Sequence, residues 1–109
     1  MVGLTLVDAG ESIMVRTVWV CIVPRAADEE VIVVDASEGG IQSRWHAQRV
    51  INALRAKLPL EQITRDVVVL TDGTEGGQAF GSSPNAEAFI RRMMPQLSDY
   101  KWQSKELDW

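Results

Sequence analysis

Two short acidic loops hold the side chains of this sequence that are best suited to chemistry. Residues 35–40 follow an apolar run at 31–34, and residues 72–77 follow another at 67–71. Each loop reads aspartate, small residue, hydroxyl residue, glutamate, glycine, glycine. Oxygen ligands suit a hard cation such as magnesium or calcium, and the glycines let the backbone come close to a ligand. The predicted metal ligands are Asp35, Ser37, Glu38, Asp72, Thr74 and Glu75.

The similarity between the two loops continues into the segments that follow them. After the first loop, an apolar stripe at helical spacing comprises Ala47, Val50, Ile51, Leu54 and Leu58. The same pattern recurs 39 residues later as Ala86, Phe89, Ile90, Met93 and Leu97. Two such strand–loop–helix units are too few for a solenoid. They are either a duplication or a convergence of two common patterns, and the sequence leaves both open.

The elements that must position these loops follow from hydrophobic periodicity and turn residues. Strands are expected at residues 3–7, 13–23, 31–34 and 67–71, and helices at 43–57 and from Ser83 to about Met94. Ser83 with Pro84 behind it is a strong helix start, and Pro24 is expected to end the second strand. The order β-β-β-α-β-α predicts an α/β or α+β fold over residues 1–109. We expect a two-layer sandwich whose mixed sheet of four to five strands carries both helices on one face.

The connections between these elements place both acidic loops at one edge of the sheet. A short turn joins the second and third strands, which predicts an antiparallel hairpin. The next strand, helix and strand predict a parallel crossover. Asp35 and Asp72 should then lie within roughly 10 Å of each other at the carboxyl edge, where open sheets bind ligands. Two carboxylates about 5 Å apart in water repel by only roughly 0.8 kcal/mol, so ordinary solvated loops remain the alternative to a metal site.

Two families share parts of this pattern. Residues 31–37 and 67–73 resemble the metal-ion-dependent adhesion site of von Willebrand factor A-type domains, in which one strand ends in Asp-x-Ser-x-Ser and a later one in Thr-Asp-Gly. The resemblance covers about fifteen residues and implies that Asp35, Ser37 and Asp72 hold a divalent cation. Gly39 replaces the second serine, however. The element order also resembles a ribonuclease H-type topology, although residues 43–57 lack the acid that such nucleases need in their first helix.

Composition narrows the classes of function. The chain has 109 residues, 46% of them hydrophobic, and a formal net charge of -4. An acidic chain is not expected to bind nucleic acid directly, because such binding depends on clustered lysine and arginine. No basic leader and no apolar run near 20 residues is present, which predicts a cytoplasmic protein rather than a secreted or membrane-spanning one. The single cysteine, Cys21, is expected to be a buried, inert thiol, and the single histidine, His46, to lie on a helix flank.

Four aromatic residues are expected to contact a partner: Trp45, Tyr100, Trp102 and Trp109. Trp45 falls off the apolar stripe of its helix, and the other three lie in the aromatic C-terminal tail, residues 98–109, which is also a candidate last strand. If both helices cover one face of the sheet, the other face is bare, and a large bare apolar face is rare on a monomer. The sequence therefore predicts a homodimer that includes the tail. The favoured function is a small non-catalytic binding or protein-interaction module, with a divalent-metal-dependent hydrolase or nuclease as the alternative.

Overall fold

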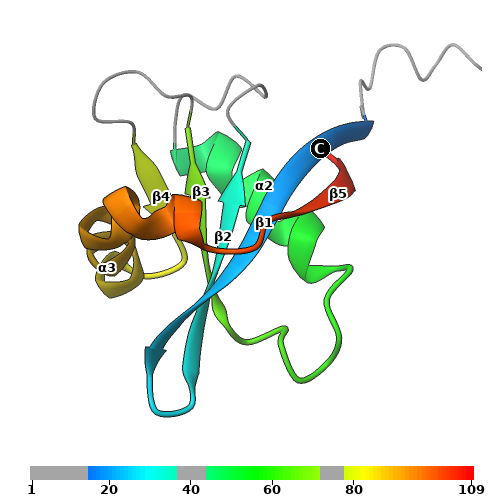
Figure 1. The fold of residues 1–109 in the computed structure, drawn as a ribbon. Coiled ribbons are helices and arrows are strands. Elements are labelled where there is room, and N and C mark those ends of the chain that lie inside the picture. Colours follow the sequence, from blue (N-terminus) through cyan, green and yellow to red (C-terminus); the bar gives the residue numbers. More distant parts are fainter. Residues whose placement is uncertain (1–14, 37–43, 72–77) are drawn as a thin grey trace, which may run out of the picture.

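The computed structural model describes residues 15–36, 44–71 and 78–109, which form an α/β fold with one mixed sheet (Figure 1). The elements are β1 (Val15–Ala26), β2 (Glu29–Asp35), α2 (Arg44–Arg55), β3 (Asp66–Leu70), β4 (Ala79–Gly81), α3 (Pro84–Met93), the 3-10 helix η2 (Met94–Asp99) and β5 (Gln103–Asp108). The sheet has the strand order β4-β3-β2-β1-β5. The predicted fold class is confirmed, whereas the strand expected at residues 3–7 lies outside the described residues.

Strand pairing agrees with the predicted connections. β1 and β2 form an antiparallel hairpin, and β2 pairs with β3 in parallel through the α2 crossover. β4 and β5 add antiparallel edges on either side. β4 was not expected, because three residues beside a glycine-rich loop carry too little periodicity to be recognised. The expected strand in the tail is present as β5.

The two helices lie on opposite faces of the sheet, so the expectation that both share one face is wrong. Alternate strand residues divide the core into two clusters. One, on what we call the α2 face, joins Ile32, Val34, Val67 and Val69 to Val50, Ile51 and Leu54 of α2. The other, on the α3 face, joins Val31, Val33, Val68 and Leu70 to Ala86 and Ile90 of α3 and Leu97 of η2. The reason is β4, which reverses the chain direction between the two helices.

Local chemistry favours both the start and the end of α3. Ser83 caps α3 by accepting a hydrogen bond from the Ala86 N–H at 3.1 Å, and Pro84 occupies the first turn. This confirms the predicted start. Pro95 lies in η2, where the chain leaves the α-helical path as expected. No helix of the described residues is long and apolar enough to cross a membrane.

β1 continues past Pro24 to Ala26, so the prediction that this proline ends the strand is wrong. Pro24 pairs with Glu30 of β2, and a bulge follows before Ala26. Proline is tolerated in a sheet where its nitrogen faces an unpaired side or where a bulge interrupts the ladder. Both conditions hold here. β5 pairs with β1 only as far as Val20, so the Pro24 nitrogen faces an unpaired side, and the bulge follows directly after Pro24.

The aromatic tail packs on its own chain. Trp109 is buried in the α2-face cluster, with the Arg16 guanidinium 4.2 Å from its ring centre. Tyr100 and Trp102 pack against the α3-face cluster, where the Trp102 indole donates to the Leu97 carbonyl at 3.0 Å. These residues and α3 cover the face that was expected to be bare. The premise behind the predicted homodimer therefore does not hold, although the oligomeric state itself stays a prediction.

Candidate functional site

The carboxyl ends of β2 and β3 lie directly side by side, with no strand between them. Asp35, the last residue of β2, is in register with Leu70, the last residue of β3. The Ala36 N–H continues the pairing with a 3.3 Å hydrogen bond to the Leu70 carbonyl. Both acidic loops therefore start at the same edge of the sheet. The other predicted ligands lie outside the described residues: Ser37, Glu38, Asp72, Thr74 and Glu75.

The second acidic loop is closed at its base by two residues. The Thr71 N–H donates to the Gln78 carbonyl at 3.0 Å, and the Gln78 N–H donates to the Thr71 hydroxyl at 2.9 Å. This closure joins the end of β3 to the start of β4. In the part of the chain that the structure describes, no group of three or more His, Cys, Asp and Glu residues could hold a metal. Asp35 alone among the predicted ligands can be placed.

Trp45 is the exposed member of the four predicted partner contacts. Its side chain lies near the start of α2, and the residue is 64% exposed. The His46 ring is 5.1 Å from the Trp45 ring, and the Arg49 guanidinium carbon is 5.3 Å from it. A flat aromatic surface beside a cation is available for contact here. His46 is half-buried on the helix flank, as expected.

An ion pair that the sequence analysis missed ties the two helices together around β4. Glu87 of α3 is buried, and both of its carboxylate oxygens accept hydrogen bonds from the Arg44 guanidinium of α2. The Gly81 N–H donates to the same carboxylate at 2.9 Å. The hydrogen bonds from Arg44 lower the pKa of Glu87 below its usual value. The signal in the sequence was an acid placed between Ala86 and Ile90, on the buried stripe of α3.

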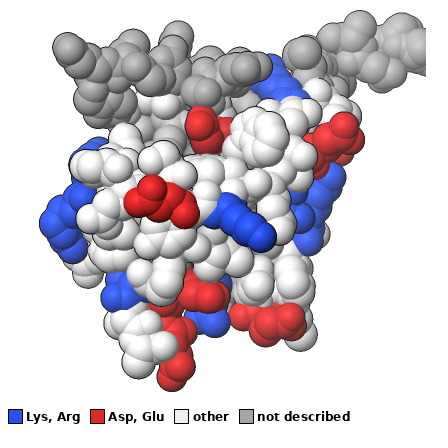
Figure 2. Space-filling view, viewed as in Figure 1, with Lys and Arg blue, Asp and Glu red and all other residues white. Residues whose placement is uncertain are grey.

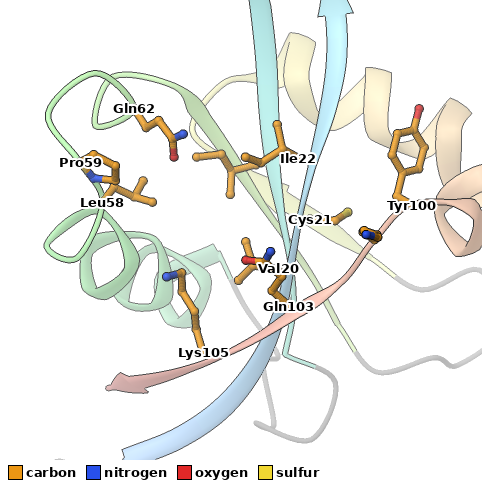
Figure 3. A pocket seen from close by; sticks show the side chains of 11 residues that line it. Val20, Cys21, Ile22, Leu58, Pro59, Gln62, Tyr100, Gln103 and Lys105 are labelled. Carbon is orange, nitrogen blue, oxygen red and sulfur yellow. The ribbon is translucent and has the colours of Figure 1, made fainter.

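A groove opens where β5 stops pairing with β1. The antiparallel pairing of β1 and β5 runs from Val15 to Val20, so residues 21–26 have no strand on that side within the described residues. A cavity of about 530 Å³ lies against this stretch (Figure 3). We call it the β1 groove. Its lining residues come from β1, β2, the segment after α2, β5 and the chain that enters β5.

The β1 groove has an apolar floor between two unlike walls. Its floor is formed by Val20, Ile22 and Ile32. One wall is formed by Leu58, Pro59 and Gln62, Tyr100 lies on the opposite side (Figure 3), and Lys101, Gln103 and Lys105 complete the lining. Figure 3 shows the first wall on one side of Val20 and Ile22 and Tyr100 on the other. Ile22 is 39% exposed although it lies in the middle of the longest strand, so the groove leaves apolar surface in contact with water.

Cys21 also lines the β1 groove but has the character of an inert thiol. The residue is 2% exposed, which confirms the expected burial. Burial raises the pKa of the Cys21 thiol to about 11, because the thiolate would lose its hydration. At neutral pH the side chain is therefore an uncharged thiol. It is neither a nucleophile nor a source of negative charge in the groove.

The charge around the β1 groove differs from that of the whole chain. Its lining includes two lysines and no acidic residue, whereas the protein carries a net charge of -4. On the face seen in Figure 2, acidic and basic side chains are interspersed over the described residues. The concentration of lysine at the groove is therefore a local feature.

Comparison with known proteins identifies no relative of this chain. No protein-family model matches the sequence, and no curated protein and no solved structure is significantly similar to it. Function is therefore inferred from the geometry of the carboxyl edge and of the β1 groove.

Proposed function

We propose that the protein is a small non-catalytic interaction module that binds an extended segment of a partner protein as an added strand on β1. The observation that carries this proposal is the half of β1, residues 21–26, that β5 leaves unpaired beside the β1 groove. Extended peptides bind exposed sheet edges through main-chain hydrogen bonds, and nearby pockets accept their side chains. The chain offers both features at the same place.

Main-chain groups of successive strand residues point to alternate sides of the strand. This alternation indicates which N–H and C=O groups of β1 are available to a bound strand. The Ala36 N–H bonds to β3, so Ile32, two alternations away on β2, also faces β3. Its partner across the antiparallel pair, Ile22, must then face away from β2. Pro24 faces the same way, which suits a residue without an N–H. A bound strand would therefore pair with both main-chain groups of Ile22 and with the Pro24 carbonyl.

Pro24 also limits how far a bound strand can pair with the main chain of β1. Unpaired strand edges promote aggregation, and a proline or a bulge at the edge is a common protection. Both occur here, at Pro24 and before Ala26. Main-chain pairing is thus confined to a short segment around Ile22. The affinity must come mainly from side chains that enter the groove, which makes the proposed binding selective for sequence rather than generic for strands.

The test uses a neutral, capped eight-residue peptide of alternating valine and threonine. Amide resonances of residues 21–26 other than Pro24 should shift on titration when the labelled protein is followed by NMR. The same peptide with alternate amides N-methylated should not bind, because it cannot pair as a strand. Ile22→Asn should abolish binding, and Val15→Asn, at an exposed position of the same strand, should leave it unchanged. If no strand-forming peptide shifts residues 21–26, the proposed function is wrong.

A divalent-metal-dependent hydrolase or nuclease is the second proposal, and it is favoured by the parallel pairing that sets Asp35 beside Leu70. Calcium or magnesium titration, followed by NMR at Asp35 and Thr71, tests the expected cation. Asp35→Asn should remove metal binding and any hydrolytic activity together. Metal binding without hydrolysis of phosphodiester or ester substrates would leave an interaction module with a bound ion. No shift at either residue would remove this proposal.

A further inference from the structure

We infer that the partner segment bound in the β1 groove carries acidic residues at the end that lies beside β5 and apolar residues along the rest. This inference rests on the proposed function and adds the chemistry of the partner to it. The apolar part follows from the groove floor, in which Ile22 is 39% exposed, and from the wall at Leu58 and Pro59. The acidic part follows from Lys101 and Lys105, which come from β5 and the chain that enters it.

All three lysines of the chain gather around this groove. Lys101 and Lys105 line it, and Lys57 lies next to Leu58 in sequence and reaches β5, where its ammonium group donates to the Glu106 carbonyl at 2.7 Å. Within the described residues, Lys101 and Lys105 form no ion pair, in contrast to Arg25, Arg44 and Arg65. Two cations beside an apolar floor, with no acid among the lining residues, favour a carboxylate on the bound segment.

The remaining polar groups of the groove agree with this chemistry. Gln62, Gln103 and Tyr100 are among the lining residues, and their side chains carry two amides and a hydroxyl. All three can donate hydrogen bonds to a carboxylate or to the carbonyls of a bound strand. The Cys21 thiol stays protonated at neutral pH, because burial raises its pKa to about 11, and so it does not oppose an anion.

A second copy of this chain is a poorer occupant than an acidic peptide. Two copies that met at their β1 grooves would each bring Lys101 and Lys105 to the interface, and neither groove has an acid among its lining residues to pair with them. Like charges set against each other across an interface oppose binding. Each copy also carries a net charge of -4, which adds repulsion at longer range. An acidic and apolar segment of a different protein avoids the first of these penalties.

The test varies the charge of the peptide and of the groove separately. Three kinds of capped peptide share an alternating valine and threonine segment and differ in a terminal pair of residues, which is two glutamates, two glutamines or two lysines. Each kind is made in two versions, with the pair at the N-terminal or at the C-terminal end. The glutamate peptide should bind most tightly and the lysine peptide most weakly. Lys101→Gln and Lys105→Gln should each weaken the glutamate peptide about fivefold, which corresponds to roughly 1 kcal/mol for an exposed charge pair. Arg49→Gln, which removes one charge elsewhere, should not change binding.

The outcomes separate this inference from the proposed function. If all three peptides shift residues 21–26 with equal affinity, strand addition stands and the acidic preference is wrong. If the two lysine variants bind the glutamate peptide as the unaltered protein does, the assignment to Lys101 and Lys105 is wrong. If no peptide shifts residues 21–26, the proposed function is wrong and this inference is wrong with it. Lys101 is exposed and Lys105 is half-buried without an ion pair among the described residues, so thermal unfolding should change little in either variant.

Discussion

The two strand–loop–helix units match closely in sequence but occupy opposite faces of the sheet. Both have an apolar strand, a loop with the same order of residue types and a helix with the same apolar stripe. α2 packs on the face formed by Ile32 and Val34, whereas α3 packs on the face formed by Val31 and Val33. Similar local sequence therefore did not lead to a similar position. The difference lies in what the chain does immediately after each loop.

After β2 the chain proceeds to α2, but after β3 it first folds back as β4. This three-residue strand runs antiparallel to β3 and returns the chain to the end where β3 began. There Asp66 accepts hydrogen bonds from the Ser82 hydroxyl at 2.7 Å and the Ser83 hydroxyl at 3.1 Å. Ser83 then starts α3 from this opposite end of the sheet. A short hairpin thus sends the second helix to the other face.

The largest expected effect compares the two cores directly. Leu54 of α2 and Ile90 of α3 are both fully buried. Leu54→Ala and Ile90→Ala should each lower the free energy of unfolding by about 2–5 kcal/mol, because each leaves a cavity in a packed cluster. Urea unfolding measures both. Phe89→Ala should cost less than Ile90→Ala, since Phe89 is only partly buried. A loss below about 1 kcal/mol for either helix would show that its face of the sheet is not a packed core.

The next largest loss of stability is expected in β4, the strand that distinguishes the two units. A β-carbon at Gly81 would lie 2.9 Å from Cγ2 of Val68 and 3.2 Å from the Val67 carbonyl oxygen. Gly81→Ala should therefore destabilise the protein by about 1–3 kcal/mol, as overpacking usually does. Thr17→Ala, at an exposed strand position, is the control and should stay within about 0.5 kcal/mol. Equal stabilities in thermal unfolding would mean that β4 yields to accommodate a side chain.

A smaller effect comes from the ion pair that connects the helices across β4. Glu87→Gln should lower the free energy of unfolding by about 1 kcal/mol at neutral pH, because it weakens the hydrogen bonds from Arg44 and Gly81. The folded-state pKa of Glu87 lies below its usual value of 4.5. The stabilisation is thus present above that value and is lost as the pH falls through the lowered pKa. Unfolding curves of the two proteins should converge in acid. A constant difference at every pH would contradict the assigned role of the charge.

The smallest effect tests the outward side of α2. Arg49 is exposed and stacks over Trp45 rather than entering either core cluster. Arg49→Ala should change the free energy of unfolding by no more than about 0.5 kcal/mol. A loss as large as that of Leu54→Ala in the same urea experiment would place the buried stripe of α2 on the wrong side.

The homodimer was predicted from the sequence because two helices on one face of the sheet would leave the other face bare. In the structure α3, η2, Tyr100 and Trp102 cover that face. Light scattering at micromolar concentration tests the oligomeric state. A species of about 24 kDa, twice the 12.1 kDa of one chain, would require an interface other than the one first expected.

The sequence by itself determined most of the elements, though not β4, and the edge where the acidic loops begin. Apolar runs, proline and serine signals and short connections were enough for the hairpin, the parallel crossover and the start of α3, because these depend on neighbours along the chain. Asp35 was likewise placed correctly at a carboxyl edge beside β3. Its predicted companions at Ser37, Glu38, Asp72, Thr74 and Glu75 lie outside the described residues, so the metal site stays a prediction.

Only the tertiary structure decided the faces, the Arg44–Glu87 pair and the β1 groove. Each depends on contacts between residues far apart in sequence, such as Val20 with Gln103 or Arg44 with Glu87. Hydrophobic periodicity shows that a strand is buried on both sides, but it cannot show which element covers which side. It also cannot show where a neighbouring strand stops. The groove exists because β5 ends its pairing at Val20 while β1 continues to Ala26, a difference in length that only assembled strands reveal.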